Sequence, residues 1–376
     1  MRTNGRITAY IDLKAVDFNF GCMKDNLAPG TQVIAVIKTD GYGHGAVEIA
    51  KWTEHYEYIW GFAVAAFSEA EELREAGIRK PILILGYSFE ENYEQMVEMQ
   101  IRPAIFTMDM AVKFAEAAEK KGVQAPFHLA VDTGMSRIGI SCDEAGMNLA
   151  EAICAIPQLK AEGVFTHFSR ADETDKSYTQ YQLQRFRWFC ERLEQSGVKN
   201  LIRHCSNSAS IIDMEDACMD AVRAGISIYG IYPSDEVKKE KVALKPVMEL
   251  KSHIVYLKEV ERGTQVSYGG TYVAPDRRRI ATVPVGYGDG YPRSLSNKAS
   301  VLIRGKRVPI IGRICMDQFM VDVTGIEAEH LDEVTLIGKD GEEEITVGEL
   351  SDICGRFPYE FICDIGKRVP RVYLKN

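Results

Sequence analysis

Between about residues 30 and 230, short apolar runs alternate with longer stretches in which apolar positions recur at helical spacing. Eight runs are mostly uncharged, as expected for strands covered on both faces: 33–37, 59–64, 82–85, 103–106, 127–131, 159–165, 201–205 and 221–223. Amphipathic stretches such as 46–52, 68–76, 110–121 and 180–195 lie between them, and Gly77, Gly122 and Gly197 close several. The pattern predicts an α/β fold, either a closed parallel barrel or a doubly wound open sheet.

Past Pro246 the pattern changes to short β-branched segments separated by Gly, Pro and Asp turns. The expected strands are 253–257, 279–284, 299–303, 308–311, 320–323 and 333–337. This part of the chain is predicted to be an antiparallel β domain, and the charged stretch 234–245 is the expected linker.

Composition excludes several function classes. Lys+Arg 45 against Asp+Glu 54 gives a net charge of −9, which argues against a nucleic-acid partner. No apolar stretch is long enough to span a membrane, and the first residues lack the apolar centre of a signal peptide. Nine Cys without a C-x-x-C pair suit a reducing compartment, so we expect a cytoplasmic protein. The seven His show no metal-ligand spacing, so no metal site is expected.

Lys38 stands at the end of a buried strand, before a glycine-rich turn into a helix. It is either a rim lysine paired with a carboxylate or an amine in a partly dry pocket that can form a Schiff base. Gly41-x-Gly43-x-x-Ala46 also matches a dinucleotide fingerprint. Because the next strand ends without a carboxylate for the ribose, a nicotinamide oxidoreductase is a distant alternative.

Polar clusters follow four other predicted strands, at 132–137, 167–169, 204–208 and 223–226. Each has a simpler explanation: His167 and His204 as core histidines, Arg137 and Arg223 as rim ion pairs, and Asn207 as a helix cap. Together they indicate an active site, because a barrel collects such residues at the carboxyl ends of its strands.

These segments resemble the alanine racemase family, and the resemblance covers nearly the whole chain. It rests on the segments VIKTDGYGHG (36–45), VDTGMSRIG (131–139), HCSNSA (204–209), VSYG (266–269), VGYGDG (285–290), ICMDQ (314–318) and YE (359–360). The resemblance implies a (β/α)8 barrel over residues 14–240 that binds pyridoxal 5'-phosphate. It also implies a C-terminal antiparallel β domain over residues 241–376, to which the first strand, within residues 1–13, is added.

By this resemblance, Lys38 binds the cofactor covalently, and Arg223 faces the pyridine nitrogen, braced by His204 and His167. The remaining implied cofactor contacts, most of them on the phosphate, are Tyr42, Asn207, Ser208, Gly225, Ile226 and Tyr359. A guanidinium cannot give up its charge, so it opposes protonation of the pyridine nitrogen. This favours racemisation over transamination and elimination.

A racemase needs a base on each face of the substrate's α-carbon. The resemblance assigns one face to Lys38 and the other to Tyr268 of the partner subunit in a homodimer. It places Arg137, Met316 and Asp317 at the substrate carboxylate and Tyr287 in the access corridor. Taken alone, Tyr268 also reads as an interface or hairpin tyrosine, and Met316 as a core residue.

Two positions refine the expectation. Many family members carry a carbamylated lysine where this chain has Ala130, so Arg137 needs another partner, such as chloride or a carboxylate. Membrane-linked serine racemases carry a smaller polar residue where this chain has Tyr359, and a bulky phenol favours a methyl side chain.

The expected function is therefore interconversion of L- and D-alanine, which supplies D-alanine for peptidoglycan. The alternatives are a serine or broad-specificity racemase, a decarboxylase of the same architecture, and a non-catalytic protein of the barrel-only kind that binds the cofactor. Arg223 argues against the decarboxylase, which needs a carboxylate at the ring nitrogen. The second domain argues against the barrel-only protein.

Overall fold

The structure is a computed structural model that describes residues 5–375; residues 1–4 and 376, which the predicted β domain included, lie outside this range. The chain divides into two compact units. The barrel unit comprises residues 16–41 and 46–245, and the β unit comprises residues 5–15, 42–45 and 246–375. No helix within 5–375 combines the length and the apolar character needed to cross a membrane.

Parallel strands form the centre of the barrel unit. In sheet order they are β10 (Ala221–Ala224), β2 (Gln32–Val36), β3 (Ile59–Val64), β4 (Ile82–Ile84), β5 (Ile101–Ile105), β6 (Ala125–Asp132), β8 (Leu159–Phe165) and β9 (Ile202–His204), with β7 (Ile140–Ser141) beside β6. The Arg223 amide on β10 donates to the Ser206 carbonyl after β9 at 3.0 Å, so the sheet nearly closes. All eight predicted strands are confirmed, in a barrel and not an open sheet.

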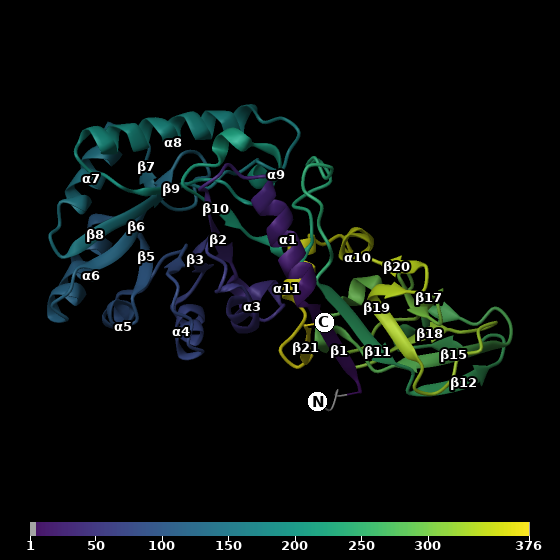
Figure 1. Ribbon diagram of the computed structural model, residues 1–376. Coiled ribbons are helices and arrows are strands. Elements are labelled where there is room, and N and C mark those ends of the chain that lie inside the picture. Colours follow the sequence, from purple (N-terminus) through teal and green to yellow (C-terminus); the bar gives the residue numbers. More distant parts are fainter. Residues whose placement is uncertain (1–4, 376) are drawn as a thin grey trace. The chain divides into compact units, whose positions relative to one another are not determined.

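Helices follow the strands along the chain and lie outside them (Figure 1). They are α1 (Leu13–Asp25), α3 (Ala46–Thr53), α4 (Phe67–Glu75), α5 (Tyr93–Glu98), α6 (Met108–Lys120), α7 (Glu144–Cys154), α8 (Ser177–Gln195) and α9 (Ser208–Asp213). In α6, Met110, Phe114 and Ala118 are buried four residues apart, which gives the helix one apolar face. Thr107 caps its start by accepting from the Met110 amide. Gly122 follows its end with φ +64°, in the left-handed region that glycine tolerates.

The β unit contains a ten-stranded sheet. Its main path runs β12 (Tyr256–Val260), β15 (Arg278–Val283), β18 (Phe319–Asp322), β17 (Lys306–Ile311), β16 (Ser300–Ile303), β19 (Glu333–Asp340), β11 (Met248–His253), β1 (Ile7–Asp12) and β21 (Arg371–Leu374), with β20 (Glu343–Ile345) beside β19. A separate hairpin joins β13 (Gln265–Val266) and β14 (Tyr272–Val273), and the helices are α10 (Val347–Cys354) and α11 (Pro358–Cys363). The described pairs are antiparallel except β1 with β21, so the predicted antiparallel β domain is confirmed, with one parallel pair at its edge.

One predicted strand, 253–257, was also wrong. β11 ends at His253 and β12 begins at Tyr256, so the run falls across two strands. β11 pairs with β1 and β19, whereas β12 pairs with β15. Between them the Ile254 amide donates to the Asp332 carbonyl and the Val255 amide donates to the Thr282 carbonyl. The continuous apolar run concealed this change of partner.

Candidate functional site

Lys38 begins a strained turn at the carboxyl end of β2. The turn α2 (Lys38–Tyr42) is left-handed at Thr39, Asp40 and Gly41, with φ of +54°, +51° and +61°. A non-glycine residue in this conformation costs roughly 1–2 kcal/mol. The Asp40 carboxylate stabilises the turn by accepting from the Ala46 amide at 2.9 Å. The chain therefore holds Lys38 where the strand ends, at a cost in backbone strain that is typical of functional sites.

Arg223 is a buried cation at the end of β10, with 3% of its surface exposed. Its guanidinium donates to the carbonyls of Thr166 (2.6 Å), His204 (2.7 Å) and Cys205 (3.0 Å). It also contacts Nδ1 of His204 at 2.9 Å and Nδ1 of His167 at 3.3 Å. Burial lowers the pKa of Arg223 to about 10, so it stays charged at neutral pH.

No carboxylate within residues 5–375 pairs with Arg223, so the rim ion-pair reading of this residue was wrong. The two histidines contact its guanidinium, so they are more than core residues satisfied by backbone. Burial lowers the pKa of His167 to about 3, and the charges of Arg223, Arg137 and Lys38 act in the same direction. Arg223 lies near the carboxyl end of β10, and Lys38 and Arg137 follow the carboxyl ends of β2 and β6. Because these strands are parallel, the three cations lie at the same end of the barrel.

Ser208 and Ser227 are two buried polar residues that follow β9 and β10. The Ser208 hydroxyl, at the start of α9, accepts from the Gly225 amide at 3.0 Å and the Ser227 amide at 3.4 Å. The Ser227 hydroxyl is buried, and it lacks a hydrogen-bond partner in the described part of the chain. Ile226 begins the 3-10 turn η3 (Ile226–Tyr229). Asn207 accepts from the Ser210 amide at 3.1 Å and caps α9, as its simpler reading expected.

The loop after β6 carries Arg137. Asp132 accepts from the amides of Gly134 and Ser136 at 2.9 and 3.0 Å, and Arg137 follows with an exposed side chain. Ala130, where the carbamylated lysine was expected in relatives, is 2% exposed. It belongs to an apolar cluster with Ala104 and Phe165. The position at which the resemblance expects a lysine therefore lies in an apolar cluster in this chain.

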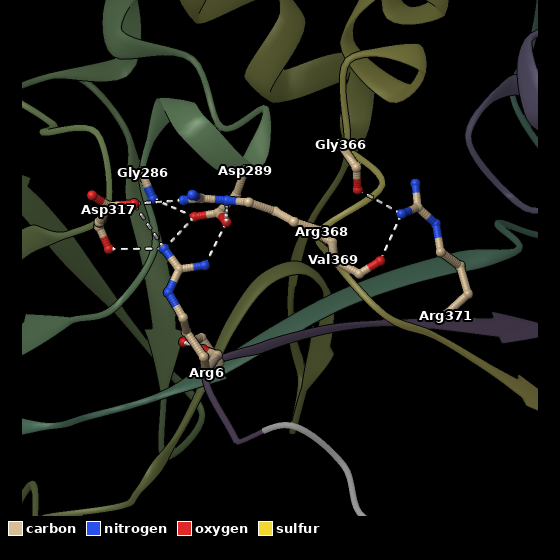
Figure 2. A network of polar contacts seen from close by, with 9 residues as sticks. Arg6, Gly286, Asp289, Asp317, Gly366, Arg368, Val369 and Arg371 are labelled. Carbon is tan, nitrogen blue, oxygen red and sulfur yellow. Dashed lines mark hydrogen bonds and ion pairs between the residues drawn. The ribbon is translucent and has the colours of Figure 1, made fainter.

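In the β unit, Tyr42 and Tyr359 form a pair with ring centroids 6.0 Å apart. Arg371 on β21 connects the segments that carry them. Its guanidinium donates to the carbonyl of Gly43, next to Tyr42, at 2.9 and 3.0 Å, and to that of Ile365, after α11, at 2.6 Å. Figure 2 shows its further bonds to Gly366 and Val369. A side chain on Gly43 would lie 2.3 Å from the Ile362 carbonyl oxygen, so glycine is required here.

A second network in the β unit joins Arg6, Asp289, Asp317 and Arg368 (Figure 2). Asp289 is fully buried and binds Arg6 at 2.5 and 2.9 Å and Arg368 at 2.7 Å. The same Arg368 binds the Asp317 carboxylate at 2.7 Å.

The turns that carry Tyr287 and Met316 are joined directly. The Tyr287 amide donates to the Cys315 carbonyl at 3.1 Å, and the Gly288 amide donates to the Met316 carbonyl at 2.9 Å. Asp289, on the first of these turns, also accepts from the Gly286 amide at 2.9 Å. With the two arginines, these bonds make the turns one rigid assembly.

Four predicted site residues of the β unit are exposed, one of them Asp317. Tyr268 is 68% exposed between β13 and β14, Met316 is 53% exposed and Tyr287 is 43% exposed. The core reading of Met316 was therefore wrong.

The predicted site residues thus fall into two groups. The barrel unit holds Lys38, Arg137, His167, His204, Asn207, Ser208, Arg223, Gly225 and Ile226, and the β unit holds Tyr42, Tyr268, Tyr287, Met316, Asp317 and Tyr359. Sequence reasoning missed the polar residues that support them: His128, Glu162, Arg6, Arg368 and Arg371. Glu162 had a detectable signal, because a carboxylate inside the predicted buried strand 159–165 is unusual.

Comparison with known proteins supports one family over both units. The family models for the alanine racemase N-terminal and C-terminal domains match residues 11–233 and 247–373. An alanine racemase of Desulforamulus reducens is 45% identical over 98% of this chain and 99% of its own length. The alanine racemase structure from Clostridium difficile 630 matches at TM-score 0.95 and 40% identity, over 99% of this chain and 97% of its own. The structure of a Bacillus anthracis alanine racemase with bound L-Ala-P matches at TM-score 0.94 and 34% identity, over 100% and 97%. The chain belongs to the alanine racemase family of enzymes.

Proposed function

We propose that this protein interconverts L- and D-alanine with pyridoxal 5'-phosphate as cofactor and supplies D-alanine for peptidoglycan. The observation that carries the proposal is the buried Arg223, held by two histidines at the barrel mouth that also presents Lys38. A cation in this position suits a reaction that must avoid protonating the pyridine nitrogen.

The described residues fit the cofactor. The Ser208 hydroxyl and the unpartnered, buried Ser227 hydroxyl offer polar groups for a phosphate. Tyr42 and Tyr359 would add phenol donors, and Asn207, Gly225 and Ile226 would complete the pocket. Lys38 would hold the cofactor covalently, and Arg223 would face its ring nitrogen. When bound, pyridoxal phosphate withdraws electrons from the substrate's α-carbon and makes its proton acidic.

Two side chains would move the α-proton. The Lys38 amine takes or returns it on one face, and the Tyr268 phenol does so on the other. Tyr268 is exposed on the β unit, which suits a residue that enters the site of a partner subunit in a homodimer. Arg223 keeps its charge throughout, so the ring nitrogen gains no proton from it.

The substrate carboxylate would be bound by Arg137 and by the turn at Met316 and Asp317. A free aspartate would repel that carboxylate. Arg368 binds the Asp317 side chain at 2.7 Å and Arg6 lies 3.6 Å from it, so its charge is compensated. Tyr287, on the turn joined to this one, would line the access corridor.

Tyr359 favours alanine over serine, because a phenol beside the substrate side chain leaves room for a methyl group and crowds a hydroxymethyl group. A serine or broad-specificity racemase is the alternative. The ratio of kcat/KM for alanine to kcat/KM for serine distinguishes these two functions. Alanine should be preferred by about tenfold or more, which is the order of discrimination that one group on a substrate produces in a pocket. Equal values would contradict the preference.

The direct test is racemisation of L- and D-alanine, followed by circular dichroism with added pyridoxal phosphate. Lys38→Ala should lose activity in both directions, because it removes both the covalent attachment and one base. Lys51→Ala, an exposed lysine on α3, is the matched control and should behave like the native protein. Normal turnover by Lys38→Ala, or an inactive native protein that carries the cofactor, would refute the proposal.

A further inference from the structure

A chain of polar side chains runs from Arg223 through the interior of the barrel. Arg223 contacts Nδ1 of His204 at 2.9 Å, and Nε2 of His204 contacts Nδ1 of His128 at 2.8 Å. Nε2 of His128 lies 3.5 Å from the Glu162 carboxylate, which is an ion-pair contact and not a hydrogen bond: within residues 5–375 this buried nitrogen has no hydrogen-bond partner. Glu162 in turn accepts from Arg102 at 2.8 and 3.3 Å. Five strands contribute to this network: β10, β9, β6, β8 and β5.

The interior position excludes water from the two imidazoles. His204 and His128 are both 0% exposed. The Phe165 ring stacks on His204 with centroids 5.1 Å apart, and the Trp60 ring lies 5.3 Å from His128. Burial lowers the pKa of both histidines, so both are neutral. Each therefore carries one proton, on one of its two nitrogens.

Arg223 at one end of this row of side chains and Glu162 near the other favour the same proton positions on the two imidazoles. Arg223 can only donate, so Nδ1 of His204 must accept and its proton must sit on Nε2. That Nε2 then donates to Nδ1 of His128, which places the second proton on Nε2 of His128, toward Glu162. An ionised carboxylate can only accept, so it favours the same arrangement. Burial raises the pKa of Glu162, but the contacts with His128 and Arg102 outweigh it and bring the pKa down to about 2.

We propose that His128 and Glu162 are positioning residues for Arg223: they orient both imidazoles so that His204 always presents an acceptor to the guanidinium. The inference rests on the proposed function, in which Arg223 faces the ring nitrogen of the cofactor. Arg102 anchors Glu162 through two hydrogen bonds and so sets the far end of the chain. The opposite arrangement would bring the N–H groups of Arg223 and His204 face to face, unpaired in a dry interior, which is unfavourable.

The direct test reads the proton positions in the native holoenzyme. Nitrogen-15 chemical shifts of histidine-labelled protein report which ring nitrogen is protonated. Both His204 and His128 should carry the proton on Nε2. A proton on Nδ1 of either residue, or a doubly protonated ring, would overturn the proposal. This measurement needs no substrate. The proton positions can therefore contradict the positioning role while the protein is still a racemase, and the protein can lack racemase activity while the proton positions are as predicted.

Variants test whether His128 and Glu162 act on Arg223 through His204. In His128→Leu, His204 loses its acceptor, and we expect kcat for racemisation to fall about three- to tenfold, the effect of one hydrogen bond. The amide oxygen of His128→Asn can take the place of Nδ1, so this variant should recover most of the loss. Glu162→Leu should resemble His128→Leu and raise the ratio of transamination to racemisation.

Thr179→Val is the control for altering a buried polar group of the same unit. The Thr179 hydroxyl is buried on α8, outside this chain of contacts, and lacks a hydrogen-bond partner among residues 5–375. It should leave both kcat and the product ratio unchanged. Equal losses in the His128 leucine and asparagine variants, or no loss in either, would contradict a positioning role.

Discussion

In the proposed function, Arg223 is the residue that selects one reaction of the cofactor. Its hydrogen-bond partners within residues 5–375 are three carbonyl oxygens and two imidazole nitrogens. These groups stabilise the charge by hydrogen bonding without neutralising it. The site therefore keeps a full positive charge where a carboxylate would favour a protonated ring.

Replacing this cation tests that account. Arg223→Glu should promote protonation of the ring nitrogen and raise keto-acid formation per racemisation event by about tenfold or more, since one pKa unit corresponds to a factor of ten. Keto acid can be measured with a coupled dehydrogenase, and racemisation by circular dichroism. Arg79→Glu, a charge reversal at an exposed position, is the control. An unchanged product ratio in Arg223→Glu would remove the electrostatic argument.

The buried histidines make stability depend on pH. The pKa values of His128, His167 and His204 are lowered in the folded protein, to about 3 for His167, mainly by burial. Below the ordinary value of 6.5 the unfolded chain binds protons that the folded chain does not. The free energy of unfolding should therefore fall as pH decreases from 6.5, by about 1.4 kcal/mol per pH unit for each histidine.

Urea unfolding between pH 7 and pH 5, followed by tryptophan fluorescence, measures this loss. His167, whose pKa is lowered to about 3, predicts a slope of about 1.4 kcal/mol per pH unit below pH 6.5, and His128 and His204 add to it in the same direction. His128→Asn should reduce the slope. Equal stability at both pH values, or an unchanged slope in the variant, would show that these imidazoles are protonated in the folded protein.

At the scale of elements, the barrel strands were predictable because strands buried on both faces appear as uncharged apolar runs. β3 and β8 begin and end at the predicted residues. In the β unit the run at 253–257 misled the prediction, because strand partners depend on residues far away in the chain. β1, for example, lies between β11 and β21, which are more than 230 residues away in the chain.

The joined turns at Tyr287 and Met316 give a prediction at this scale. Arg368→Gln removes the strongest contact of the Asp317 carboxylate and leaves a negative charge beside the proposed substrate carboxylate. We expect KM for alanine to rise about tenfold, which corresponds to one charge-assisted hydrogen bond. The cofactor should stay bound, because its proposed contacts are elsewhere.

Arg304→Gln breaks a comparable pair with Asp332 in the same unit and is the matched control. Steady-state kinetics and the cofactor absorption spectrum separate the two effects. A loss of cofactor without a change in KM would contradict the proposed role of this turn.

For the whole molecule, motifs along the chain predicted candidate site residues but not the contacts that hold them in place. Lys38, Arg223 and the histidines could be found because they follow predicted strands. The contact between Arg6 and Asp289 could not be found, because 283 positions separate the two residues. Supporting contacts of this kind depend on the folded chain.

The central proposal is that Lys38 and Tyr268 act in one site from two different chains. Co-expression of Lys38→Ala and Tyr268→Ala chains with different affinity tags would allow the mixed dimer to be purified. One of its two sites would contain both bases, so we predict about half the native activity, against almost none in either parent dimer. A mixed dimer as inactive as its parents would contradict the account, because it would place both bases in the same chain.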